Sequence, residues 1–343
     1  VLFIASVYTH LAAFHIPFMK ILQERGYEVH AAASSSEGRR EDVERVGVTC
    51  WEIPFARSPY SPANIQAYRK LKDLLREHHF DLIHVHTPVA AFLGRYLAKA
   101  TNQGAVLYTA HGFHFYQGAP RSNWLIYYTA ERIASRWTDG LIVINSEDFE
   151  NAQRLGLKSG ENLFYVHGVG VDLSPYSDPP EGERSIREEL RIGPDDVVVT
   201  CVAELNENKN HDFLLDAWRE LNKRCNSAHL LLRGKGERME ILQKRVEKEQ
   251  IPRVHFLGYR QDVPQILKET DIAALVSRRE GLPKCIMEAM AMGLPVVASN
   301  VRGNRDLVEN EHTGFLVELG DISGLIRALE RLILDPALRA TMG

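Results

Sequence analysis

Two carboxylates in the last quarter of the chain stand where they could bind a ligand rich in hydroxyl groups. Glu280 and Glu288 lie eight positions apart in the segment SRREGLPKCIMEAMAMGLPVVAS. The residues between them predict a loop that turns into a helix, because Gly281 frees the backbone and Pro283 suits a first helical turn. The N–H groups at a helix start attract anions. The segment therefore predicts a phosphate site beside two hydroxyl-accepting carboxylates, as a sugar nucleotide would require.

The residues around this segment indicate how it is positioned. An apolar strand is expected over residues 271–276 and another over 295–298, with the helix over 284–292 between them. The loop then lies at the carboxyl end of a strand, which is where open parallel sheets bind ligands.

The motif E-G-L-P-K-C-I-M-E-A-M-A-x-G-x-P-V-V-A-S resembles the signature of glycosyltransferase family 4, and the resemblance extends in weaker form over nearly the whole chain. This family comprises retaining nucleotide-sugar transferases. The resemblance implies an α/β protein of the GT-B fold, with two Rossmann-like domains facing each other across a cleft. It also implies that Glu280 contacts hydroxyls of the donor sugar and Glu288 the ribose. The motif residues expected beside the donor are Gly281, Leu282, Pro283, Lys284, Cys285 and Ile286.

The composition is that of an ordinary soluble protein, and 343 residues suffice for two domains. We expect an N-terminal acceptor-side domain over 1–168 and a C-terminal nucleotide-sugar domain over 169–343, without the returning C-terminal helix that is usual in the family. The formal charge of −4 gives no global attraction to nucleic acid, so no such partner is expected. Four cysteines without paired spacing and the lack of a long apolar run favour a cytoplasmic location, at most on the inner membrane face.

A further strand end in the second half carries a candidate phosphate ligand. The strand expected over 197–205 is followed by Asn206 and Lys209, and the resemblance implies that this lysine binds the donor diphosphate. Most family members have an arginine five positions before that lysine, where this chain has Glu204. A carboxylate there would repel a pyrophosphate by about 1 kcal/mol or more.

Two more strand ends are suited to the nucleoside. One carries two glycines that allow close backbone approach, and the other matches the place where the family holds the nucleobase. These candidates are Gly234, Gly236, Tyr259 and Arg260.

The first half offers histidines rather than a dinucleotide motif. The turn SVYTH, residues 6–10, lacks G-x-G-x-x-G, which counts against a dinucleotide site. We expect a break at residues 8–10 and then a helix over 14–25. Acceptor-side contacts are expected from His10, His15, His86 and His114.

His111 follows a strand expected over 106–110 and matches the cleft histidine of the family, which lies near the reacting carbon of the donor. The resemblance therefore implies that His111 and Glu280 are the catalytic residues. An imidazole there could donate a hydrogen bond to a sugar hydroxyl or stabilise charge in the transition state.

His84 and His86 share one face of a strand over 81–86, and two such ligands could begin a metal site. No third ligand stands at a suitable spacing nearby, so we expect neither a metal ion nor a cofactor.

Residues 113–137, FHFYQGAPRSNWLIYYTAERIASRW, are dense in aromatic residues and arginines. Trp124, Leu125, Tyr128 and Ile133 could share one helix face, flanked by Arg121, Arg132 and Arg136. That face either packs on the core or meets the membrane that carries a lipid-linked acceptor.

These observations favour a transferase that moves a hexose or N-acetylhexosamine from a UDP-sugar to a glycan or polyprenyl-diphosphate-linked acceptor in bacterial capsule or exopolysaccharide synthesis. The resemblance implies no enzymic nucleophile. A UDP-sugar epimerase of the same fold and a non-catalytic sugar-nucleotide-binding subunit are the alternatives.

Overall fold

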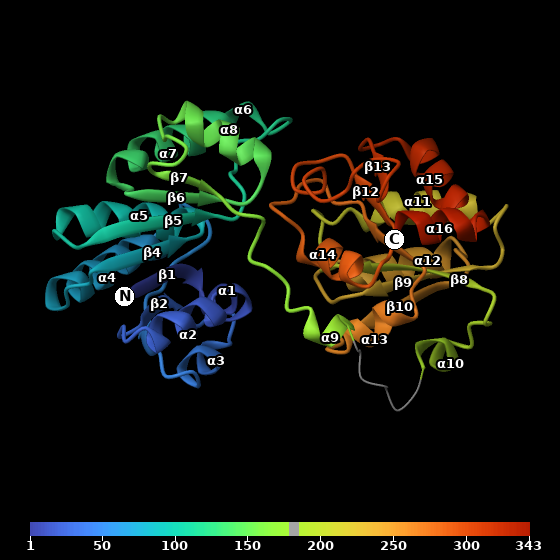
Figure 1. The fold of residues 1–343 in the computed structure, drawn as a ribbon, viewed down its shortest axis with the longest axis horizontal. Coiled ribbons are helices and arrows are strands. Elements are labelled where there is room, and N and C mark those ends of the chain that lie inside the picture. Colours follow the sequence, from blue (N-terminus) through green and yellow to red (C-terminus); the bar gives the residue numbers. More distant parts are fainter. Residues whose placement is uncertain (178–184) are drawn as a thin grey trace. The chain divides into compact units, whose positions relative to one another are not determined.

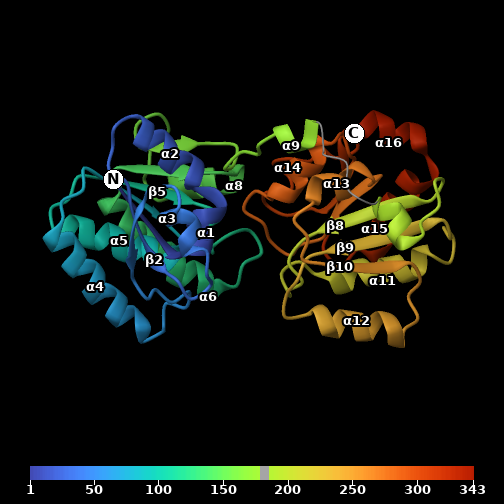
Figure 2. The same ribbon diagram turned by 90° about the horizontal axis from the view of Figure 1, so that it is seen from below.

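The computed structural model describes residues 1–177 and 185–343, which form two α/β units (Figures 1 and 2). The first unit spans Val1–Val169 and the second Gly170–Gly343. The division falls one residue after the position expected from the sequence.

The first unit is built on a parallel seven-stranded sheet of order β3-β2-β1-β4-β5-β6-β7. Its strands are β1 (Leu2–Val7), β2 (His30–Ser34), β3 (Thr49–Glu52), β4 (Leu82–His86), β5 (Ala105–Ala110), β6 (Gly140–Val143) and β7 (Leu163–Tyr165). Its helices are α1 (Tyr8–Phe14), α2 (Ile16–Glu24), α3 (Arg40–Glu44), α4 (Ala63–Glu77), α5 (Pro88–Ala100), α6 (Arg121–Asn123), the π-helical turn η1 (Trp124–Tyr128), α7 (Thr129–Ala134), the 3-10 turn η2 (Ser135–Trp137) and α8 (Ser146–Arg154).

Strand β1 shows why this sheet lies at the centre of its unit. All six of its residues are buried, as expected for a parallel strand covered on both faces. Leu2 and Ile4 pack into one apolar cluster with α4 and α5, whereas Phe3 and Ala5 pack into another with α1 and α2. The alternation of side chains along a strand thus supplies two cores.

The turn after β1 differs from the prediction. Residues 8–10 form the first turn of α1 instead of a break, and α1 and α2 are separated only at His15. Tyr8 explains the early start, because its buried hydroxyl donates to the carbonyl oxygens of Ala31 and Trp51 on the neighbouring strands. Helix α1 therefore brings His10, and His15 directly after it, close to the sheet edge.

The second unit has a parallel six-stranded sheet of order β10-β9-β8-β11-β12-β13. Its strands are β8 (Val197–Val202), β9 (Ala228–Arg233), β10 (Val254–Gly258), β11 (Ile272–Leu275), β12 (Val296–Ser299) and β13 (Gly314–Val317). Its helices are α9 (Ser174–Ser177), α10 (Ile186–Leu190), α11 (His211–Leu221), α12 (Met239–Lys248), α13 (Val263–Lys268), α14 (Lys284–Ala291), α15 (Ile322–Leu334) and α16 (Pro336–Met342).

The first six strands of each unit follow the doubly wound order 3-2-1-4-5-6. In the second unit the order reverses between β8 and β11, which pair directly. The carboxyl ends of these two strands are therefore the place where such a sheet binds its ligand.

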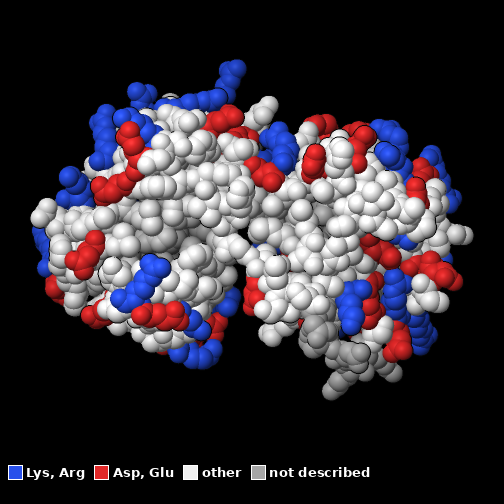
Figure 3. Space-filling model, viewed as in Figure 1, with Lys and Arg blue, Asp and Glu red and all other residues white. Residues whose placement is uncertain are grey.

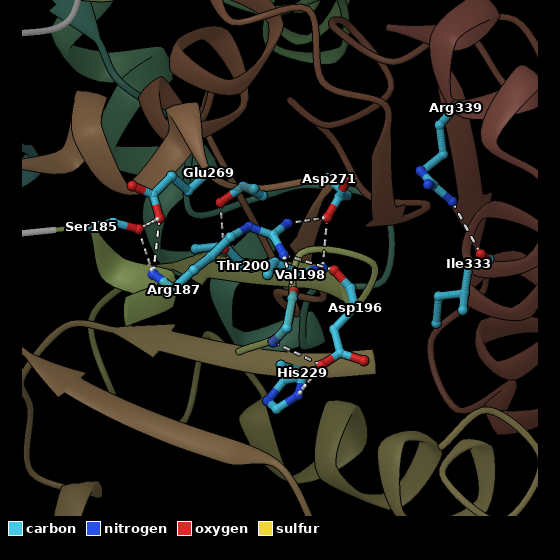
Figure 4. A network of polar contacts seen from close by, with 12 residues as sticks. Ser185, Arg187, Asp196, Val198, Thr200, His229, Glu269, Asp271, Ile333 and Arg339 are labelled. Carbon is cyan, nitrogen blue, oxygen red and sulfur yellow. Dashed lines mark hydrogen bonds and ion pairs between the residues drawn. The ribbon is translucent and has the colours of Figure 1, made fainter. Parts of the chain in front are cut away.

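A polar network holds the opposite ends of the same two strands (Figure 4). The Asp271 carboxylate, just before β11, accepts from the backbone N–H of Val198 at 2.8 Å and from the Arg187 guanidinium of α10 at 2.9 Å. Arg187 also donates to the carbonyl oxygen of Asp196 at 2.8 Å. These bonds fix the register of β8 against β11 and so position the loops at their carboxyl ends.

Candidate functional site

An ion pair joins the loops that follow β8 and β11. The Lys209 ammonium lies 2.5 Å from a carboxylate oxygen of Glu280, and the two side chains are 19% and 10% exposed. Burial alone would lower the pKa of Lys209, but the Glu280 carboxylate outweighs it and raises that pKa above its ordinary value. Lys209 therefore keeps its charge at neutral pH, in a place where water is partly excluded.

The backbones of the same two loops are tied together. The Asn208 side chain donates to the carbonyl oxygen of Arg279 at 3.0 Å, and the backbone N–H of Arg278 donates to the carbonyl oxygen of Asn208 at 2.7 Å. Asn206 accepts from the backbone N–H of Lys209 at 3.1 Å, which shapes the turn. These bonds hold together two loops whose residues lie 71 positions apart in the sequence.

The loop after β12 supports Glu280 from the other side. Arg302 is buried, and its Nε donates to the carbonyl oxygen of Glu280 at 3.0 Å. Gly303 has φ +82°, and a Cβ there would lie 2.5 Å from the carbonyl oxygen of Gly281. Only glycine lets the two loops approach this closely. The sequence reasoning missed both residues, although an arginine and a glycine directly after a buried strand were a usable signal.

Glu288 lies on the inner side of α14 and is buried. The Lys284 ammonium is 3.2 Å from its carboxylate. On its other side stands the hydroxyl of Tyr176 in α9, whose pKa is raised by burial and by a hydrogen bond to Glu288. The prolines and acids of residues 174–183 predict an exposed connection; Ser174 and Ser177 are exposed, whereas Tyr176 is buried and departs from that prediction. Residues 178–183 of that prediction lie outside the described residues.

The position at which α14 starts reduces the number of backbone N–H groups that could bind an anion. Pro283 is the residue before the first helical turn, so the helix starts at Lys284. Ile286 belongs to the apolar core, and its backbone N–H already donates to the carbonyl oxygen of Pro283 at 3.1 Å. Ile286 is therefore an anchor of the helix, and the candidate amides are those of residues 281, 282, 284 and 285. Burial raises the pKa of the Cys285 thiol to about 12, so this side chain is uncharged.

The loops after β9 and β10, which the sequence predicted to hold the nucleoside, make different contacts. Cβ atoms at Gly234 and Gly236 would lie 1.9 Å and 2.4 Å from the carbonyl oxygens of Ala203 and Leu205, so these glycines allow the loop to pack on the end of β8. The exposed ring of Tyr259 lies under the guanidinium of Arg233, at 5.0 Å.

The charged side chains of Arg260 and Glu204, near these loops, bind neighbouring side chains of the protein. The Arg260 guanidinium is bound to the carboxylates of Asp262 and Glu189, so its side chain is not poised for a phosphate. Glu204 accepts from the Asn206 side chain at 2.9 Å, which gives this carboxylate a local partner.

In the first unit, four histidines gather where β1, β4 and β5 end. Ligand nitrogens of His10, His15, His86 and His111 all lie within 4.8 Å of one another. Burial lowers the pKa of all four imidazoles below the ordinary value, that of His111 to about 4. The cluster is therefore neutral at pH 7.

A pocket of about 270 Å³ opens beside this cluster. It is lined by Ser6, Val7, His10, Arg57, Thr87, Pro88, His114 and Tyr127. Two of the predicted acceptor-side histidines, His10 and His114, thus face a cavity. The other two, His15 and His86, are buried inside the unit.

Thr87 adopts a strained backbone at the edge of this pocket, with φ 63° and ψ 141°. Such a conformation is rare for a β-branched residue and is held only where surrounding bonds enforce it. Here the Thr87 hydroxyl accepts from the backbone N–H of Ser6 at 2.9 Å and donates to the carbonyl oxygen of His86 at 2.5 Å. These bonds hold Thr87 in its strained conformation and so fix the turn that follows His86.

Comparison with known proteins identifies the family. A family model described as Glycosyltransferase Family 4 matches residues 18–174, and one described as Glycosyl transferases group 1 matches residues 196–335. Glycosyltransferase EpsD of Bacillus subtilis (strain 168) is 36% identical over 347 residues, covering 100% of this chain and 90% of the relative. The chain belongs to glycosyltransferase family 4.

Other relatives agree with this placement. An Escherichia coli protein named UDP-Gal:alpha-D-GlcNAc-diphosphoundecaprenol alpha-1,3-galactosyltransferase is 33% identical over 273 residues, which are 78% of this chain and 70% of that protein. HepE of Anabaena, whose crystal structure contains UDP and glucose, has a TM-score of 0.79 at 20% identity over 99% of this chain and 91% of its own. At that identity the likeness shows the fold, and it confirms the predicted GT-B class.

The second unit brings the motif residues of family 4 close to one another. Lys209 and Glu280 are in contact, and Glu288 lies along the same helix start. His111 belongs to the first unit, at the end of β5, where its Nε2 lies 3.4 Å from Nδ1 of His86. This glycosyltransferase thus carries its two predicted catalytic residues on different units.

The aromatic segment of the first unit divides its apolar residues between two environments. Trp124 and Tyr128 pack against the core from η1, a π-helical turn. Leu125, Ile126 and Ile133 are exposed instead, with Leu125 72% accessible. The single apolar face predicted for Trp124, Leu125, Tyr128 and Ile133 is therefore wrong, because the wider π-helical turn changes the angular spacing of side chains. No helix of the described residues is long and apolar enough to cross a bilayer.

Proposed function

We propose that this glycosyltransferase moves a hexose or N-acetylhexosamine from a UDP-sugar, with retention at the anomeric carbon, in the assembly of a bacterial surface polysaccharide. The observation that carries the proposal is the partly buried ion pair of Lys209 and Glu280, which joins the loops after β8 and β11 just before α14. It holds a cation for a diphosphate and a carboxylate for sugar hydroxyls within one hydrogen bond of each other.

The charges of this site suggest how the donor is bound and activated. Lys209 exchanges its carboxylate partner for the diphosphate, which frees Glu280 to accept from the sugar hydroxyls. The amides before and at the start of α14 add fixed dipoles toward the leaving phosphate. Glu288, held by Lys284 and Tyr176, accepts from the ribose.

The chemistry requires no enzymic nucleophile and no metal ion at the donor. Acceptor attack on the side that the nucleotide leaves gives retention, and the β-phosphate takes the acceptor proton. His111 donates a hydrogen bond to the sugar, which it can do as a neutral imidazole. Transfer is expected to persist in EDTA, and loss of activity that Mg²⁺ or Mn²⁺ restores would contradict a metal-free donor site.

The relatives support the donor and the pathway. EpsD and the capsular polysaccharide transferase CapM of Staphylococcus aureus match this chain over 100% and 96% of its length. The Escherichia coli relative is named for a UDP-galactose donor and a diphosphoundecaprenol acceptor. This name supports our proposal that the acceptor is a lipid-linked diphosphate sugar.

Two variants test the donor site. UDP-sugar binding is measured by thermal shift against UDP-, GDP- and ADP-sugars, and transfer by release of UDP in the presence of a lipid-linked acceptor. Glu280→Gln should reduce transfer about 100-fold or more with a smaller effect on binding, whereas Lys209→Met should weaken both. Lys223→Met, an exposed lysine of the same unit, is the matched control. An active Glu280→Gln enzyme, or release of a free epimer of the sugar, would refute the assignment.

The acceptor implies contact with a membrane, and the first unit has a suitable surface. Leu125, Ile126 and Ile133 are exposed among the arginines 121, 132 and 136. Figure 3 shows basic side chains gathered along the edge of this unit that carries α6 to α8. Exposed apolar residues flanked by arginines suit the interface of an anionic bilayer.

A sedimentation assay tests this surface. The double variant Leu125→Gln and Ile126→Gln should lose binding to phosphatidylglycerol vesicles while keeping its melting temperature, because neither side chain is in the core. The control Ile241→Gln removes an exposed apolar residue of the second unit, whose 55% exposure lies between those of Leu125 and Ile126. Equal sedimentation of wild type and double variant would exclude this face as the membrane contact.

A further inference from the structure

The histidine cluster of the first unit brings together ligands from four places in the sequence. His10 lies in α1, His15 between α1 and α2, His86 at the end of β4 and His111 after β5. Sequence spacing gave no sign of this set, because only His10 and His15 of its four members are near neighbours along the chain. The expectation that His86 lacks further ligands is corrected by the fold, and His84 bonds the Thr109 hydroxyl at 2.8 Å instead.

Two distances within the cluster equal the ligand spacing of a tetrahedral metal site, and all four ligand nitrogens lie within 4.8 Å of one another. Nε2 of His15 lies 3.4 Å from Nε2 of His10, and Nε2 of His111 lies 3.4 Å from Nδ1 of His86. These separations are longer than a good hydrogen bond of about 3 Å. A tetrahedral zinc ion with Zn–N bonds of about 2.0–2.1 Å separates its ligand nitrogens by about 3.3–3.4 Å. Two edges of the tetrahedron are thus already at the required length.

Two buried nitrogens of the cluster also lack a partner. Among the described residues, Nδ1 of His15 and Nε2 of His86 make no hydrogen bond, although the residues are only 2% and 0% exposed. These atoms lie across the ring from Nε2 of His15 and Nδ1 of His86, which form the 3.4 Å pairs, so they face away from the metal position and do not themselves mark it.

The charge and the donor atoms around the cluster bear on which metal it would hold. The nearby positive charge that acts on His10 is Arg57, and its guanidinium is paired with Glu37 at 2.6 Å. Four imidazole nitrogens within 4.8 Å of one another suit Zn²⁺ better than Mg²⁺ or Ca²⁺, which prefer oxygen.

We propose that His10, His15, His86 and His111 form a zinc site in the acceptor-side unit. The ligand set lies within the first unit and is argued without the proposed function, but its effect on transfer rests on that function. It shares His111 with that function, so an imidazole that binds zinc is withdrawn from the sugar. Zinc at this place therefore inhibits transfer rather than assisting it.

Metal titration of the whole, untagged protein tests the site directly. After treatment with a chelator and dialysis, Co²⁺ is added as a coloured substitute for Zn²⁺. We expect one equivalent per chain, with the intense visible absorption of tetrahedral cobalt, and loss of that absorption when Zn²⁺ is added. X-ray absorption of the zinc form should show four nitrogen ligands of imidazole type.

Variants assign the ligands. His15→Gln and His86→Gln should each weaken Co²⁺ binding by about 100-fold or more, beyond the effect of losing an outer-shell partner. His114→Gln, in the same loop as His111, and His79→Gln, on the surface, are controls that should bind as the wild type does. Should the buried variants fail to fold, His10→Gln and the X-ray absorption of the wild type still decide the question. Absence of stoichiometric cobalt, a spectrum that is not tetrahedral, or unchanged binding in His10→Gln would overturn the proposal.

Discussion

At the scale of single residues, Lys209 and Glu280 stabilise each other as well as forming the donor site. Both side chains are more than four-fifths buried and share one short ion pair. Removing one partner leaves a charge with poor access to water, whereas removing both leaves a neutral pair. The stability of the two loops should therefore depend on the pair more than on either residue.

A double-mutant cycle measures this dependence. Lys209→Met and Glu280→Gln should each lower the free energy of unfolding by about 2 kcal/mol, below the 3–5 kcal/mol of a fully buried pair because some water reaches the site. The double variant should lose at least about 1 kcal/mol less than the sum of the singles. Urea denaturation of the four proteins gives these values. Additivity within about 0.5 kcal/mol would show that the pair contributes nothing beyond its members.

Residue types and strand ends predicted much of this site but not its supports. Lys209, Glu280 and Glu288 could be named because a long motif and a strand end point to them. Tyr176 could not, because its role depends on which loops meet after folding, and Arg302 was missed although its place after a buried strand was a signal. The histidine cluster is a stronger case, since its four members come from parts of the chain up to 101 positions apart that only the sheet order brings together.

At the scale of elements, the loops after β11 and β12 are held together by a close backbone approach. A Cβ at position 303 would press on the carbonyl oxygen of Gly281 and on the Cβ of Glu280. Since the donor loop carries Glu280, this contact sets the position of the proposed sugar-binding carboxylate. Continuous apolar runs predicted the strands on either side, but not this contact between their loops.

Gly303→Ala tests the approach, and Gly320→Ala is its matched control. Both glycines have positive φ, +82° and +87°, but a Cβ at Gly320 meets nothing within 4 Å. The control should lose about 1 kcal/mol from backbone strain alone. Gly303→Ala should lose about 2 kcal/mol more and bind UDP-sugar at least about 10-fold more weakly, because the Glu280 loop must shift. Equal melting temperatures and equal UDP-sugar affinities for the two variants would show that the loops tolerate separation.

At the scale of the whole molecule, buried neutral histidines tie the stability of the protein to pH. His211, at the start of α11, is buried, and burial together with the Lys209 charge lowers its pKa to about 4. Arg238 acts in the same direction and Asp212 opposes both. The unfolded chain, whose histidines titrate near 6.5, takes up this proton more readily than the folded one.

Acid should therefore destabilise the protein in a defined window. The contribution of His211 is fully present above about pH 6.5 and is lost as pH falls toward 4, since the unfolded state then binds the extra proton. A shift from 6.5 to about 4 corresponds to about 3 kcal/mol at most. Urea denaturation at pH 7.5 and pH 5 should show a smaller loss of stability for His211→Gln than for the wild type. The exposed histidine variant His79→Gln should retain the full loss. If His211→Gln and wild type lost the same free energy between these pH values, His211 would have to be protonated in the folded protein or reached by water, and the neutral interior inferred for it would be wrong.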